Sequence, residues 1–166
     1  MTHRAAGLFV LLFASLGACA STQDTSGRGG GGGAPLLARS EAPDPDALDD
    51  YAIPPGRCGT ILWTLSGASP VPIFRSVDDG MASMVIEGQR TQLNLVGRGG
   101  EARLGIPSVQ HFEGQTQSGA VRVTMRGQWG QPFPAGNYVE EAVLRVQGAD
   151  GWSRVVPVAG IAGCRP

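Results

Sequence analysis

From residue 58 onward, apolar and polar residues alternate in short runs, and this alternation constrains the fold more than any other feature of the sequence. In TILWTL, Ile61, Trp63 and Leu65 fall on one side of an extended chain. In AVRVTMRG, residues 120–127, valine and methionine alternate with arginine and threonine. A period of two residues places one set of side chains on a buried face of a β-sheet and the other set in water. This part of the chain is therefore predicted to form β-strands, with almost no helix.

Glycine, asparagine and aspartate separate these runs at intervals of about ten residues, which is typical of all-β folds. Asp79-Gly80 predicts a two-residue type I′ hairpin turn, and residues 87–89 predict a second tight turn. Trp63 and Trp152 fall in expected strands and are predicted to lie in the core. We expect an all-β fold, a small antiparallel barrel or a two-sheet sandwich, because an open sheet would leave edges exposed. Its roughly eight strands are expected near residues 59–65, 70–75, 81–87, 90–96, 107–113, 119–126, 138–147 and 152–159.

The N-terminus has the layout of a secretory signal peptide. The chain opens MTHR, with one arginine, and continues with an apolar run of twelve residues from Ala5 to Leu16. Small residues follow the run, as they do before a cleavage site. A helix that spans a bilayer needs about 20 apolar residues, so the run is too short for a lasting membrane span. Residues 1–18 are therefore predicted to be removed.

The motif LGAC, residues 16–19, resembles the lipobox of bacterial lipoproteins. The resemblance implies that Cys19 receives a diacylglyceryl group and becomes the acylated N-terminus after cleavage, so that covalent lipid holds the protein on a membrane. Ala20 and Ser21 follow, without the aspartate that retains enterobacterial lipoproteins at the inner membrane. We expect a bacterial cell-envelope protein, anchored in the outer membrane and facing the periplasm. The alternative is an ordinary signal peptide with a coincidental cysteine.

Residues 19–57 are rich in glycine, proline and acidic residues, and we expect them to form a flexible linker. The glycine run 29–33 lacks the lysine of a phosphate-binding loop, and the aspartates of residues 44–50 lack the spacing of a calcium loop. The sequence therefore predicts neither a cofactor nor a metal site here. The folded periplasmic domain is expected to cover residues 58–166.

The two remaining cysteines, Cys58 and Cys164, bracket the predicted domain. In an exported chain, two such thiols are expected to form a disulfide. On the chain-entropy model, closing so long a loop contributes up to about 4.7 kcal/mol. The alternative, a redox or metal-binding pair, would need further ligands or activating neighbours that the sequence does not supply.

Charge and composition exclude several classes of function. The net charge is −1, and all thirteen cationic residues are arginine. A chain with a slightly negative net charge is not expected to bind nucleic acid. Without lysine, Schiff-base chemistry and Ser-Lys dyads are impossible. Beyond the signal peptide the only histidine is His111, and no nucleophile elbow accompanies it. We therefore expect no enzymatic activity.

Residues 127–138, GQWGQPFPAGNY, are predicted to form a long loop that carries Trp129, Phe133 and Tyr138. Aromatic side chains in loops on a β scaffold often contact a partner, so these three are the candidate binding residues. In the alternative interpretation, Trp129 and Phe133 fold back and plug one end of the domain.

The segment MASMVIEGQRTQLNLVGRGGEARLG, residues 81–105, is similar to the membrane-bound lysozyme inhibitors. The resemblance implies an eight-stranded barrel with a disulfide on a small outer-membrane lipoprotein. That family inhibits through a serine-containing motif and a Lys-Gly motif inserted into the lysozyme cleft. Residues 99–103 and 112–114 occupy these places here and contain neither the serine nor the lysine. No inhibitory residue is therefore carried over.

These patterns together predict a lipid-anchored envelope protein whose β domain is a binding or accessory module. Its expected partner is a protein of the envelope. Two alternatives stay open: an inhibitor of lysozyme or of another periplasmic hydrolase, and a piloting lipoprotein of a secretion complex.

Overall fold

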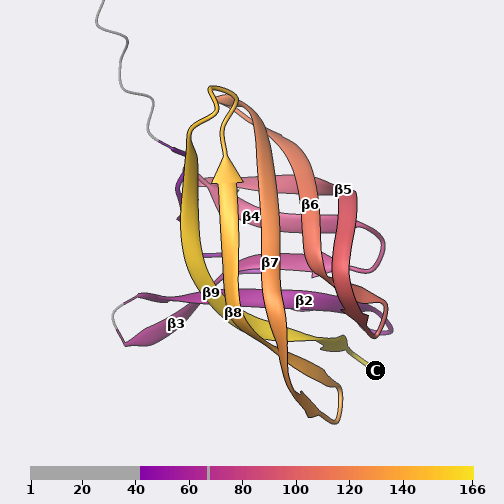
Figure 1. Cartoon of the computed structure of the whole chain (residues 1–166). Helices are drawn as coiled ribbons and strands as arrows, with labels where there is room; N and C mark the ends of the chain where they lie inside the picture. The colour runs from indigo at the N-terminus through magenta and orange to yellow at the C-terminus, as the bar shows by residue number, and fades with distance from the viewer. Residues whose placement is uncertain (1–41, 67) are drawn as a thin grey trace, which may run out of the picture. The chain divides into compact units, whose positions relative to one another are not determined.

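The computed structural model describes residues 42–66 and 68–166, and these residues form a closed antiparallel barrel with one short extra strand (Figure 1). The predicted all-β class is confirmed. Of the two architectures that the sequence left open, barrel and sandwich, the structure is the barrel. No helix occurs within these two ranges. The strands are β1 (Pro45–Asp46), β2 (Cys58–Ser66), β3 (Ser69–Val77), β4 (Met81–Ile86), β5 (Gln89–Arg103), β6 (Ile106–Thr116), β7 (Gly119–Phe133), β8 (Gly136–Gln147) and β9 (Ser153–Cys164).

Each strand from β2 to β9 pairs with the next along the chain, and β9 pairs with β2 to close the barrel. The β4–β5 turn, Glu87-Gly88, has positive φ at both residues (53° and 74°), as a type I′ turn requires. The predicted two-residue turn at Asp79-Gly80 is wrong. Three residues, 78–80, join β3 to β4, and among them only Gly80 has a positive φ, at 87°. A single left-handed glycine at the end of a three-residue connection is the other common hairpin geometry.

Inward-facing apolar side chains fill the middle of the barrel. Phe74 of β3 and Phe112 of β6 meet there edge to face, with ring centroids 5.5 Å apart. These strands are separated by β4 and β5 in the sheet, so the contact spans the interior. A small barrel with such a centre has a packed core.

Residues 42–57, which we call the strap, run along the barrel, and the linker prediction is wrong for them. Within the strap, β1 pairs with β4, and the amide of Leu48 donates a hydrogen bond to the Pro72 carbonyl at 2.7 Å. Leu48 and Ile53 are buried, with exposures of 2% and 8%. The average composition of this segment is polar, but two well-placed apolar side chains and backbone hydrogen bonds offset its ordering entropy.

Two acidic residues of the strap face arginines of the barrel. Asp50 lies 3.6 Å from Arg75 and 3.7 Å from Arg90, and Asp44 lies 3.2 Å from Arg154. Such partly exposed pairs contribute little stability one by one. Their arrangement nevertheless explains why the strap lies along these strands.

The other N-terminal predictions lie outside the described residues: the signal peptide 1–18, Cys19 and the linker as far as residue 41. Of the two tryptophans expected in the core, Trp152 is 62% exposed and Trp63 is only half-buried. Trp152 follows the bend between β8 and β9, where the chain has left the barrel wall. In residues 42–66 and 68–166 no helix has the length and apolar character needed to cross a membrane.

We expect Leu48→Ala to lower the free energy of unfolding by about 2–5 kcal/mol, because the substitution removes a buried side chain that fastens the strap. Leu65→Ala is the matched control, since Leu65 is 70% exposed and its loss should change the value by less than about 0.5 kcal/mol. Urea unfolding of both variants measures the difference. Equal, small effects would mean that the strap does not stabilise the barrel.

Candidate functional site

The predicted binding loop, residues 127–138, is a continuation of two strands, so the loop prediction is wrong. β7 continues to Phe133 and β8 begins at Gly136, which leaves Pro134-Ala135 as the turn. The ladder between them runs to its end, where Phe133 pairs with Gly136. Glycine and proline suggested a loop, but here they lie beside bulges: the register shifts between Arg126 and Gln128 and again between Trp129 and Pro132.

Trp129, one of the three candidate binding residues, is turned toward the barrel. Its half-buried indole packs against the core, and its Nε1 donates a hydrogen bond to the Glu101 carbonyl at 3.0 Å. The Arg103 guanidinium lies 6.0 Å from the ring centroid, on the same β5 segment. Trp129 thus fastens the β7–β8 hairpin to β5. This agrees with one part of the alternative interpretation, in which Trp129 folds back onto the domain.

The other two candidates, Phe133 and Tyr138, come together. Their ring centroids are 5.3 Å apart, and Tyr138 is 46% exposed. Tyr138 pairs with Ile161 of β9, and Ile161 pairs with Ile61 of β2. An apolar row therefore crosses the outer face of β8, β9 and β2, and it begins at the exposed tyrosine.

An apolar hollow of about 300 Å³ lies in this outer face, next to the β7–β8 turn. A Cβ on Gly59 in its floor would lie 2.6 Å from Ile53 Cδ1, so the strap needs glycine there to approach β2. In Figure 1 the β7–β8 turn and the C-terminus lie at the same end of the barrel. The hollow is lined by Ile53, Gly59, Ile61, Phe133, Ala135, Ile161, Gly163, Cys164, Arg165 and Pro166.

The predicted disulfide between Cys58 and Cys164 is confirmed, and it borders the hollow. The two cysteines are directly opposite each other in the β2–β9 ladder. The bond thus joins the first residue of β2 to the last residue of β9, across the strand pair that closes the barrel.

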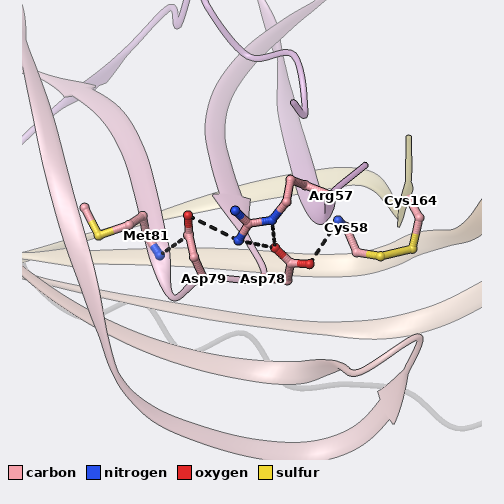
Figure 2. A network of polar contacts seen from close by, with 6 residues as sticks. All are labelled: Arg57, Cys58, Asp78, Asp79, Met81 and Cys164. Carbon is pink, nitrogen blue, oxygen red and sulfur yellow. Dashed lines mark hydrogen bonds and ion pairs between the residues drawn. A yellow bond between two sulfur atoms is a disulfide. The ribbon is translucent and has the colours of Figure 1, made fainter. Parts of the chain in front are cut away.

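Beside the disulfide lies a cluster of charges that the sequence did not reveal (Figure 2). Arg57 Nε donates a hydrogen bond to Asp78 Oδ1 at 2.6 Å, and Arg57 Nη2 lies 3.3 Å from Asp79 Oδ2. Asp78 Oδ2 also accepts the backbone N–H of Cys58 at 3.2 Å. The cluster holds the β3–β4 turn against the start of β2.

These contacts shift two pKa values in opposite directions. The hydrogen bond from Arg57, followed by that from the Cys58 amide, lowers the pKa of Asp78 below its ordinary value. The hydrogen bond to Asp78 is likewise the main reason that the pKa of Arg57 is raised. In the sequence, the only sign of this cluster is the pair Asp78-Asp79 before Gly80, and that stretch predicts only a turn.

His111 is exposed on β6, where its Nδ1 lies 3.1 Å from Thr124 Oγ1. Among the described residues, no group of three or more histidine, cysteine, aspartate or glutamate side chains is placed so that it could hold a metal ion. Phe112, next to His111 in the sequence, is buried in the core with 1% exposure. The arrangement at the hollow supports recognition of an apolar group on a rigid sheet.

Comparison with known proteins shows no match to any protein family, to any curated protein or to any solved structure. The similarity to lysozyme inhibitors stays a prediction.

We expect Asp78→Asn to destabilise the barrel at neutral pH and to have less effect in acid. A carboxyl whose pKa is lower in the folded state contributes stability above its unfolded pKa of about 3.9, and that stability is lost as the pH falls through the folded pKa. Urea unfolding from about pH 7 to about pH 2 tests whether the difference from the wild type shrinks with acid. Asp49→Asn, at an exposed strap residue, is the control. A difference that does not change with pH would contradict this role of Asp78.

Proposed function

We propose that this chain is a lipid-anchored protein of the bacterial cell envelope, and that its barrel binds a partner on the outer face formed by Phe133, Tyr138 and the apolar hollow. The lipobox-like LGAC motif at residues 16–19 supports the anchor. The disulfide between Cys58 and Cys164 suits an oxidising compartment such as the periplasm.

The observation that carries the binding role is an exposed aromatic side chain beside an apolar hollow on a rigid sheet. Tyr138 is 46% exposed, although Phe133 and Ile161 lie next to it. Binding surfaces are enriched in aromatic anchors beside well-formed pockets, and rigid strands hold such anchors in place. Because Phe74 and Phe112 fill the interior, the outer face is where a partner has access.

The proposed role is binding without a chemical step. Carboxylates close to the disulfide are engaged by Arg57, which leaves them as structural counter-ions. His111 contacts the Thr124 hydroxyl, and no carboxylate of the described residues forms an ion pair with it. To act as a general base, His111 would need a nucleophile or a positioned water together with a group that orients its ring, such as a carboxylate.

Cys19→Ser is expected to abolish lipid attachment and to release the protein from the membrane. Two or three acyl chains bind a bilayer far more strongly than one chain does. The apolar run of the signal peptide is expected to be removed by cleavage, so it does not replace them. Fractionation of cells, with metabolic labelling by a fatty acid, measures both effects. Cys58→Ser should leave labelling intact and serves as the control. A Cys19→Ser protein that remained fully processed and membrane-bound would contradict the anchor.

A photo-crosslinking amino acid placed at Tyr138 should capture an envelope protein in intact cells, because this exposed side chain packs against Phe133, which lines the hollow. The same amino acid at Trp152, which is 62% exposed and lies between β8 and β9, is the matched control. Capture from both positions alike, or from neither, would rule out a specific surface at Tyr138.

The identity of the captured protein separates the functional alternatives. A lysozyme or another hydrolase would favour the inhibitor, and a component of a secretion channel would favour the piloting lipoprotein.

A further inference from the structure

The hollow beside the disulfide has hydrocarbon walls and one cation at its rim. Ile61 and Ile161 form its floor, and Ile53 and Phe133 stand on either side. Arg165 borders it and is the only charged side chain in the lining. A ligand that fits this arrangement is apolar along its length and anionic at one end.

The floor of the hollow favours a hydrocarbon chain over a peptide. β2 is paired with β3 on one edge and with β9 on the other, and β9 is also paired with β8. These strands therefore have no free backbone edge at Ile61 and Ile161 to add another strand. A peptide lying there would find no strand edge with which to pair its own N–H and C=O groups. An acyl chain has no such groups.

Arg165 is held in place by the backbone and carries a charge that no ion pair balances. Its N–H donates to the Arg57 carbonyl and its C=O accepts from the Gly56 amide, both at 2.9 Å. Its Nη1 donates to the Ile53 carbonyl at 3.2 Å. None of the ion pairs within the described part of the chain includes Arg165, whereas Arg57 is neutralised by two aspartates. An exposed guanidinium that uses one donor in the bond to Ile53 has further donors to offer a carboxylate.

The volume of about 300 Å³ is at the lower end of the range for ligand sites. It suits a single unbranched chain, and it is small for a two-chain lipid. Burial of each methylene of such a chain against the isoleucines favours binding.

We propose that this hollow binds a free fatty acid, with the acyl chain over Ile61 and Ile161 and the carboxylate on Arg165. The inference rests on the proposed function, because it assigns a ligand chemistry to the same outer face.

The test is a titration of the full-length Cys19→Ser chain with dodecanoate, followed by amide NMR. We expect saturable shifts at Ile53, Ile61 and Ile161. Dodecanol has the same chain without the charge and should bind more weakly. Arg165→Gln should weaken dodecanoate binding about tenfold and leave dodecanol unchanged, because it removes one charge-assisted contact. Arg145→Gln, on β8, is the control for a general loss of positive charge.

Ile161→Asn should reduce the binding of both ligands, and Val155→Asn should not. Both residues lie on β9, and Val155 is 58% exposed outside the hollow. Circular dichroism of each variant checks that the barrel is intact. The proposal would be overturned by absence of binding, by shifts located elsewhere, by equal affinity for dodecanoate and dodecanol, or by preference for lysophosphatidylglycerol over dodecanoate.

The dodecanoate titration and the crosslinking at Tyr138 can give opposite results, so the two proposals are tested separately. Capture of a protein at Tyr138 without dodecanoate binding would leave the binding surface standing and refute the fatty acid. Dodecanoate binding without capture of a protein would support the fatty-acid site and refute the protein-binding surface at Tyr138.

Discussion

The pairing of β2 with β9 is the interaction on which the rest of the structure depends. It joins the first and the last strand of the barrel in one ladder, from Cys58 opposite Cys164 to Trp63 opposite Ala159. Without it both strands would be free edges and the interior would be open to water. The disulfide lies at the last pair of this ladder and holds it shut. The floor of the apolar hollow is made by the same two strands, so barrel closure also creates the candidate site.

Close approach at this seam explains part of the high glycine content. A Cβ on Gly160 would collide with the Ile61 carbonyl and lie 2.6 Å from Leu62 Cδ2. A Cβ on Gly163 would meet the Ala135 carbonyl of the β7–β8 turn. Glycines that suggest loops when the sequence is read alone are therefore required inside β9, where the hairpin and the neighbouring strand come close.

The strap and the Asp78 cluster reinforce the same end of the barrel. The strap ends at Arg57, and Arg57 binds the β3–β4 turn through Asp78 beside Cys58. Backbone hydrogen bonds between Arg57 and Arg165 then link the strap to the residue after β9. The hollow is thus bounded by segments distant in sequence: the strap, the β7–β8 turn and the C-terminal residues. Hydrogen bonds connect the strap both to the β3–β4 turn and to the residue after β9.

Prediction succeeded where the signal was local and failed where contacts between distant segments decided the outcome. Alternation in residues 120–127 located a strand correctly, because side chains one residue apart face opposite sides of any sheet. The loop prediction for residues 127–138 failed, since bulges allow glycine and proline within a paired hairpin. For the candidate site, the sequence pointed to Phe133 and Tyr138, whose binding role stays a prediction, whereas Arg165 and the strap residue Ile53 come close to them only through the fold.

The sequence by itself determined the all-β class, the number of barrel strands and the pairing of the two cysteines in the barrel, because alternation, turn residues and a bracketing thiol pair are local or countable features. Only the tertiary structure decided that the sheet closes on itself, that residues 42–57 pack on its outside, and that Trp129 turns inward while Tyr138 stays exposed. The physical reason is that closure, strap docking and side-chain exposure depend on which distant surfaces meet, and no single stretch of the chain encodes that.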